Sequence, residues 1–224
     1  YKPPFPAVKG LFGSPTIINN VETLASIPKI ISKGPDWFSS FGTKDSAGFK
    51  CFSVSGHVNN PGNFEIPLGT PFKTLLELAG GVKDGKKLKA VIPGGSSVPV
   101  VPGDTMLNTD MDYESIVNAG SLLGSGAVII MDEDTNMVEV IHRIARFYYS
   151  ESCGQCTPCR EGTGWMFKVI DKILKGNGTL DDLKTLESIP SMISGSTICA
   201  LGDAAAMPVE SFIKHYRSEF LQYI

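Results

Sequence analysis

The sequence has few cysteines, few histidines and no long apolar run. Its longest apolar stretch, Ala127 to Met131, is far shorter than the roughly 20 residues of a membrane-spanning helix. The 5 cysteines are too sparse and too unevenly spaced for a disulfide scaffold, which favours a reducing compartment. Lysines and arginines are scattered and the net charge is −3, so a basic surface for nucleic acid is lacking. We therefore expect neither membrane insertion nor nucleic-acid binding.

The length leaves room for two small domains. With 224 residues, of which 42% are hydrophobic, the chain can bury a substantial core. It opens on a Pro-rich stretch without an initiator methionine or a leader, so we expect a piece of a longer protein or a subunit encoded in pieces. A helical pattern begins at Asn19-Asn20-Val21-Glu22-Thr23-Leu24 and stops at Gly34-Pro35. Residues 1–48 are thus interpreted as a connector.

Residues 49–133 change to a strand-like period. Phe52 and Val54 alternate with polar neighbours, and the turn residues 59–62 predict a hairpin. Thr70 is expected to cap a helix with Pro71 at its first position, and residues 90–92 and 127–131 are predicted as strands. The glycine-rich residues 93–97 lack the lysine and the helix of a phosphate loop, so we interpret them as a turn. The arrangement predicts a small α+β domain of the β-grasp kind.

Residues 134–224 carry helical periodicity throughout. The pattern predicts helices over 137–148 and 165–174, a third that Thr179 opens through a capping box, and a fourth from Pro208 to the end of the chain. Pro190 is expected to disturb the third helix. Short connections between four helices predict a four-helix bundle, with the domain boundary near 132–135.

Three cysteines follow one another at three-residue intervals between the first two of these helices. Cys153, Cys156 and Cys159 lie on a short turn with Gly154 and Pro158, and Cys199 lies in the loop before the last helix. Three close thiolates and one remote thiolate are typical of a [4Fe-4S] cluster, which offers one iron to each ligand. The sequence therefore predicts that these four cysteines hold one cluster and that the chain is a one-electron relay.

Other interpretations of these residues remain open. Zinc also accepts four thiolates, although structural zinc sites usually pair two CxxC hooks, and the thiols can instead be inert or form disulfides. Arg160, beside Cys159, either raises the cluster potential or is a solvated charge on the first helical turn. The lone Cys51 is expected to be buried as a small hydrophobic residue. The dispersed histidines are expected to be structural or exposed, namely His57, His142 and His215.

The stretches Glu151 to Gly162 and Thr197-Ile198-Cys199-Ala200-Leu201-Gly202-Asp203 together resemble the flavin-carrying, NADH-binding subunit (the F type) of respiratory NADH:quinone oxidoreductase, complex I. The opening Lys2-Pro3-Pro4-Phe5-Pro6 and the motif Asn19 to Leu24 are also similar to this family, so the resemblance covers nearly the whole chain, as the C-terminal part of the subunit. It implies that the middle domain is a soluble-ligand-binding β-grasp (SLBB) module.

The resemblance implies a function in electron transfer. In that family a hydride passes from NADH to FMN, and single electrons pass through the cluster toward further clusters and quinone. Asn19, Asn20 and Thr23 then correspond to flavin contacts, although helix capping alone also explains them. The glycine-rich FMN and NADH half of the family is missing, so this chain alone is not expected to complete catalysis.

The resemblance also implies partners and a location. The partners are other peripheral-arm subunits of complex I, including a [2Fe-2S] thioredoxin-like subunit. The location is peripheral, on the cytoplasmic side of the bacterial inner membrane or on the mitochondrial matrix side. The corresponding subunits of NAD-reducing hydrogenases and NAD-linked formate dehydrogenases share the cysteine pattern and stay open as alternatives, as does a zinc-stapled interaction module.

Overall fold

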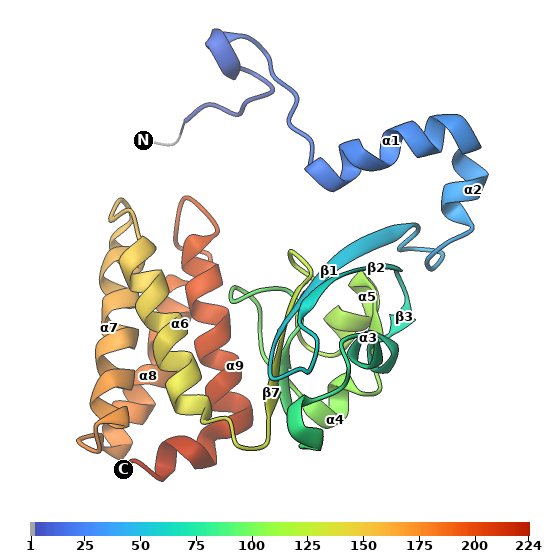
Figure 1. The fold of residues 1–224 in the computed structure, drawn as a ribbon. Coiled ribbons are helices and arrows are strands. Elements are labelled where there is room, and N and C mark those ends of the chain that lie inside the picture. Colours follow the sequence, from blue (N-terminus) through green and yellow to red (C-terminus); the bar gives the residue numbers. More distant parts are fainter. Residues whose placement is uncertain (1–2) are drawn as a thin grey trace.

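The computed structural model describes residues 3–224, so Lys2 of the opening motif lies outside the described residues. Within this range the chain mixes helices with a β-sheet, as the sequence predicts. Figure 1 shows an N-terminal segment that extends away from the rest, a sheet with short helices, and a group of long helices that includes the C-terminus. None of the helices in this range combines the length and the apolar composition of a membrane-spanning segment.

The N-terminal segment contains the helix predicted at the asparagine-rich motif. Asn20 is its N-cap, and the side-chain Oδ1 accepts a hydrogen bond from the backbone N–H of Glu22 at 2.8 Å. Gly34 ends the helix with a φ of 90°, a conformation that strains residues with a Cβ. The segment comprises a 3-10 turn and two helices, namely η1 (Leu11–Gly13), α1 (Val21–Lys33) and α2 (Pro35–Ser39).

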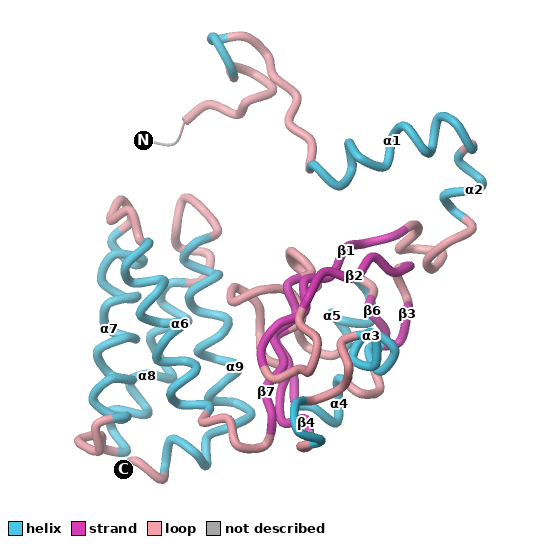
Figure 2. The backbone as a smooth tube through the Cα atoms, in the orientation of Figure 1, coloured by secondary structure: helices cyan, strands magenta, loops and turns pink. Residues whose placement is uncertain are grey.

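Within the described residues the central sheet has five strands in the order β2-β1-β7-β4-β5. Neighbours are antiparallel except β1 and β7, which run parallel. The predicted hairpin is confirmed, with Phe52 of β1 opposite Phe64 of β2. Figure 2 shows the strands gathered between the short helices and the long helices. The strands are β1 (Phe49–Gly56), β2 (Gly62–Pro67), β4 (Leu88–Ile92), β5 (Val101–Pro102) and β7 (Ala127–Asp132).

The predicted role of Thr70 as a helix cap is wrong. Thr70 and Pro71 form a short strand that pairs with Met111 and Asp110, and the Thr70 hydroxyl donates to the carbonyl of Pro67 at 2.6 Å. The helix begins at Phe72, because the two residues before it pair as a strand. These smaller elements are β3 (Thr70–Pro71), α3 (Phe72–Leu78), η2 (Lys83–Gly85), α4 (Gly103–Met106), β6 (Asp110–Met111) and α5 (Tyr113–Asn118).

The sheet separates two hydrophobic cores. Successive side chains of a strand point to opposite faces. Val91 and Ile130 therefore join the core formed with the short helices, whereas Ile92 and Met131 join the core of the long helices. The chain passes from the sheet into the long helices just after β7, close to the predicted boundary. The division into domains 49–133 and 134–224 stays a prediction.

Four long helices pack on one another in the C-terminal part. Two of their predicted starts are wrong. The second helix begins at Thr157, well before Trp165, because Cys156 is its N-cap and a proline lies in its first turn. The last helix begins at Leu201 rather than at Pro208. The helices are α6 (Met137–Glu151), α7 (Thr157–Leu174), α8 (Leu180–Ile193) and α9 (Leu201–Leu221).

Prolines are tolerated inside two of these helices. Pro190 does not end α8, which continues to Ile193, and Pro208 lies within α9. Both prolines are buried, so apolar packing offsets the backbone hydrogen bond that each ring removes. The predicted capping box of α8 is confirmed, since Thr179 Oγ1 accepts from Asp182 N at 3.2 Å and the Asp182 carboxylate accepts from Thr179 N at 2.8 Å.

The expectation that Cys51 is buried is wrong. Lys50, Phe52 and Val54 of β1 point inward, so Cys51 between them points outward and is exposed. The core of the long helices takes residues from β4 and β7 but none from β1 within the described range, which leaves this face of β1 open. The period of the strand, rather than the apolar character of the thiol, decides the exposure of Cys51.

Candidate metal centre

The three clustered cysteines lie on the turn between α6 and α7. Glu151 is the last residue of α6, and Gly154 adopts a φ of 76°, which lets the chain reverse within a few residues. Cys156 is the N-cap of α7, and Cys159 lies in its first turn. The turn therefore presents its thiols at one end of the long helices. We call residues 153–159 the hook.

The thiols of the hook differ in exposure. Cys153 is exposed, Cys156 is half-buried and Cys159 is buried. The Oγ atom of Ser152 lies 3.3 Å from the Cys159 sulfur, within hydrogen-bond distance. The Thr163 hydroxyl donates to the carbonyl of Cys159 at 2.7 Å. Contacts from both helices thus hold the innermost thiol in place.

The loop that carries Cys199 lies against the hook. The backbone N–H of Ile198 is directed at the Cys156 sulfur at 3.4 Å, and the Thr197 hydroxyl donates to the carbonyl of Cys199 at 2.8 Å. A Cβ added to Gly202 would lie 2.6 Å from the Thr197 hydroxyl oxygen, so only glycine allows this close approach. Figure 1 shows the α6–α7 and α8–α9 loops at the same end of the long helices. The tertiary structure therefore brings the loop that carries Cys199 to the hook.

Arg160 contacts the hook and is therefore more than a solvated charge. Its guanidinium donates to the carbonyl of Gly154 at 2.8 Å and forms an ion pair with Glu161 at 2.9 Å. The side chain thereby links the first turn of α7 back to the start of the hook. Its positive charge also lies beside thiols that would carry negative charge as metal ligands.

The donor set suits a soft metal centre. All four cysteines are free thiols, and thiolates are the ligands preferred by iron-sulfur clusters. Among residues 3–224, no group of three or more cysteine, histidine, aspartate or glutamate side chains converges on a point that could hold a single metal ion. Three of the cysteines instead belong to the hook, and the fourth lies in the adjoining loop before α9.

The histidines do not share a site. His57 Nδ1, just after β1, lies 3.0 Å from Asp132 at the end of β7. His142 Nε2 of α6 lies 3.1 Å from Asp171 of α7. The hydrogen bond from the Lys175 ammonium, together with that from the histidine, holds the pKa of Asp171 below its usual range. These pairs connect neighbouring elements, in agreement with a structural role.

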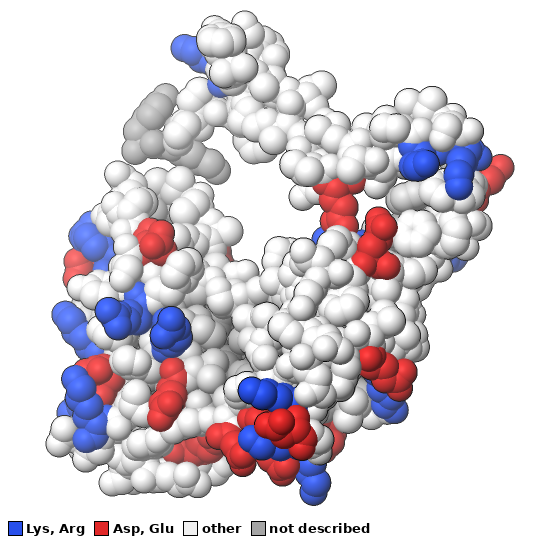
Figure 3. All heavy atoms as spheres, in the orientation of Figure 1, with Lys and Arg blue, Asp and Glu red and all other residues white. Residues whose placement is uncertain are grey.

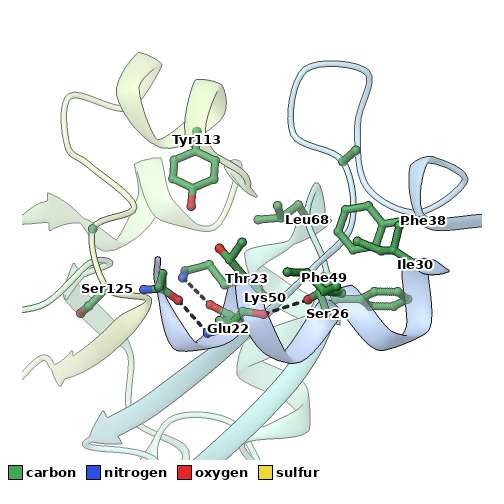
Figure 4. A pocket seen from close by; sticks show the side chains of 14 residues that line it. Glu22, Thr23, Ser26, Ile30, Phe38, Phe49, Lys50, Leu68, Tyr113 and Ser125 are labelled. Atoms are coloured by element: carbon green, nitrogen blue, oxygen red, sulfur yellow. Dashed lines mark hydrogen bonds and ion pairs between the residues drawn. The ribbon is translucent and has the colours of Figure 1, made fainter. Parts of the chain in front are cut away.

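The predicted flavin contacts lie at the start of α1, apart from the hook. Asn20 and Thr23 line a cavity of about 560 Å³ between α1 and the sheet, shown in Figure 4. Asn20 also caps α1, so the capping explanation holds for that residue. Asn19 is exposed at the start of the same helix and is not among the lining residues.

Besides Ser26 of α1, the sequence analysis missed four polar residues of this cavity. Glu22 belongs to the asparagine-rich motif and could have been predicted from the sequence, because it is an acidic residue in the first turn of a helix. The other three come from distant parts of the chain and only the fold assembles them. They are Lys50, Tyr113 and Ser125.

Comparison with known proteins matches two regions of the chain to known families. Residues 139–223 match the family described as "NADH-ubiquinone oxidoreductase-F iron-sulfur binding region", and residues 51–101 match the SLBB domain. The F-type subunit of the NADH-quinone oxidoreductase of Rickettsia bellii (strain OSU 85-389) is 51% identical over 220 residues, covering 97% of this chain and 53% of that protein. That of Mycobacterium tuberculosis (strain CDC 1551) is 51% identical over 223 residues, covering 100% of this chain and 50% of that protein.

Among solved structures, a chain of an NAD+-reducing [NiFe]-hydrogenase in the H2-reduced state is similar over the whole of this chain. The TM-score is 0.90 at 34% sequence identity, and the match covers 38% of the hydrogenase chain. The hook therefore belongs to an iron-sulfur binding region of an oxidoreductase subunit. More closely, the chain belongs to the family of F-type subunits of NADH-quinone oxidoreductase, and it spans about half the length of the curated relatives that it matches.

Proposed function

We propose that this chain is the electron-transfer part of the F-type subunit of an NADH:quinone oxidoreductase, with one [4Fe-4S] cluster held by Cys153, Cys156, Cys159 and Cys199. The observation that carries the proposal is the contact of Ile198 N with the Cys156 sulfur, which places the Cys199 loop on the hook. When bound, such a cluster takes up and releases one electron at a time. Backbone N–H groups directed at cluster sulfurs are among the contacts that set its potential.

The rest of the subunit is proposed to supply the flavin and the nicotinamide. In the complete subunit NADH is the substrate and FMN the first electron acceptor, with Asn19, Asn20 and Thr23 as this chain's share of the flavin site. The N-terminal segment supports the proposal that a further part of the subunit packs against it. It exposes many large apolar side chains that no other described residue covers. Figure 3 shows few charged side chains on this segment. The exposed residues include Phe5, Val8, Phe12, Ile17, Ile18 and Val21.

From the proposal of an F-type subunit we also propose the architecture, the partners and the location of this chain. Residues 49–133 form an SLBB-type β-grasp domain, and residues 134–224 form a four-helix bundle that binds the cluster. Other peripheral-arm subunits, including a [2Fe-2S] thioredoxin-like subunit, accept the electrons on the cytoplasmic or the matrix side of the membrane. The similarity to the hydrogenase chain makes an NAD-reducing hydrogenase subunit the second candidate, at 34% identity against 51% for the F-type subunit.

Metal analysis of anaerobically purified protein tests the cluster. We expect iron and acid-labile sulfide in the ratio of a four-iron cluster, and loss of this species in Cys199→Ala because a cluster corner loses its ligand. Cys51→Ala is the matched control, since it removes the exposed fifth cysteine away from the hook. Stoichiometric zinc without labile sulfide, or an intact four-iron species in Cys199→Ala, would contradict the proposal.

A further inference from the structure

Helix α1 contacts the sheet through a narrow stripe of residues. Glu22, Ser26 and Ile30 are half-buried, whereas the other residues of the helix are exposed. Positions i, i+4 and i+8 share one face of a helix, so this stripe is the face turned toward the sheet. The opposite face is apolar and open, with Val21 81% and Ile31 78% exposed. Apolar burial therefore does little to fix where α1 lies.

A single carboxylate joins α1 to strand β1 of the sheet. Glu22 Oε1 accepts a hydrogen bond from the backbone N–H of Cys51 at 2.6 Å, and Glu22 Oε2 forms an ion pair with the Lys50 ammonium at 3.1 Å. Figure 4 shows the Glu22 and Lys50 side chains meeting at the floor of the cavity. Within residues 3–224, no other hydrogen bond or ion pair links the segment 3–33 to the strands.

The burial of Lys50 in the sheet holds the ion pair in place. Lys50 is only 9% exposed, and Glu22 is the one partner of its ammonium among the described residues. A buried ammonium without a partner is unfavourable, so the pair holds together. A Cβ on Gly126 would lie 2.9 Å from Lys50 Cε, which shows how closely the loop before β7 encloses the lysine stem. From β7 the chain continues directly into α6 and the hook.

We propose that Glu22 is a positioning residue that sets where the flavin-contact residues lie relative to the sheet and the hook. This inference rests on the proposed function. The Asn20 side chain accepts from the N–H of Glu22, and Thr23 follows directly in the chain, so both move with Glu22. Glu22 itself acts through the sheet and needs no contact with the flavin. Because electron transfer slows steeply with distance, a shift of α1 slows reduction of the cluster by NADH and leaves the cluster intact.

The test compares variants of the complete subunit in its assembled complex. Glu22→Gln retains an oxygen that can accept from Cys51 N but leaves the Lys50 ammonium unpaired. Glu65→Gln is the matched control, because Glu65 lies directly opposite Cys51 on β2 and is exposed, with no hydrogen bond from its side chain within the described residues. Stopped-flow reduction by NADH and the electron paramagnetic resonance spectrum after dithionite reduction are measured on each.

We expect Glu22→Gln to slow cluster reduction by NADH by about tenfold or more, since small misplacements of reacting groups carry penalties of this size. The dithionite-reduced spectrum should match the wild type, which a general loss of structure would not allow. Adding Lys50→Met removes the unpaired charge, and most of the lost rate should return. The control should transfer electrons at the wild-type rate.

Two failures are distinguishable. If the wild-type complex shows no cluster reduction by NADH, the proposed function is wrong. If the wild type is active but Glu22→Gln behaves like Glu65→Gln, the positioning role is wrong. Should Glu22→Gln lose the cluster altogether, the double variant decides: a normal spectrum and a restored rate support the role of the pair, and continued loss overturns it.

Discussion

Replacing Gly162 by alanine is expected to strain the contact between α7 and α8 beside the metal centre. The new Cβ would lie 2.6 Å from Cδ1 and 2.7 Å from Cγ1 of Ile193. Carbon atoms normally approach to about 3.5–4.0 Å, so the side chain or the helix must move by roughly 1 Å. Ile193 is 1% exposed and immediately precedes the loop that carries Cys199. The displacement therefore reaches the fourth proposed ligand.

Two opposing contributions determine the size of the effect. Overpacking a core costs about 1–3 kcal/mol, while alanine stabilises a helix interior relative to glycine by about 1 kcal/mol. The expected net loss is thus about 0–2 kcal/mol for Gly162→Ala. Gly164→Ala is a matched control on the same helix, because its Cβ would meet the Tyr149 ring, which is 42% exposed and can move into solvent.

Thermal unfolding of the two variants, together with their iron content, tests this reasoning. Gly164→Ala should be more stable than Gly162→Ala by about 1–3 kcal/mol, and for a chain of this size each kcal/mol corresponds to roughly 2–4 °C in Tm. Only Gly162→Ala should also lower the iron content. Equal Tm values and equal iron content in the two variants would refute the argument from close packing.

Two pH-dependent predictions follow from individual side chains. The hydrogen bond from Lys172, with that from Thr179, holds the pKa of Asp182 below its usual range, so its contribution is present at neutral pH and is lost as the pH falls below about 4. Asp182→Asn should therefore destabilise the protein more at pH 7 than at pH 3 in denaturant titrations. Burial raises the pKa of Tyr216 to about 12, with its hydroxyl donating to the carbonyl of Lys89. Stability should decline between pH 10 and pH 12, and Tyr216→Phe should remove this part of the decline in alkaline unfolding curves.

Local sequence signals identified most elements, and their failures have physical causes. The hairpin, the capping box of α8 and the helix at Asn20 depend on residues close in sequence, so the pattern alone predicts them. Pro190 and Pro208 misled the prediction because burial compensates for the lost backbone hydrogen bond. The burial of Cys51 was predicted wrongly because the alternation of the strand, and not the residue type, decides which side chains of β1 face the core.

The candidate site likewise has one part that the sequence predicts and another that only the fold decides. The spacing of Cys153, Cys156 and Cys159 is local, and the sequence by itself determined the kind of metal centre to expect. The approach of the Cys199 loop to Cys156 depends on how α7, α8 and α9 pack, which no local pattern encodes. The pairing of Glu22 with Lys50 joins a helix to a strand that lies 28 residues further along the chain. Only the tertiary structure decided that contact, because it depends on which faces of the helix and the sheet are left to meet.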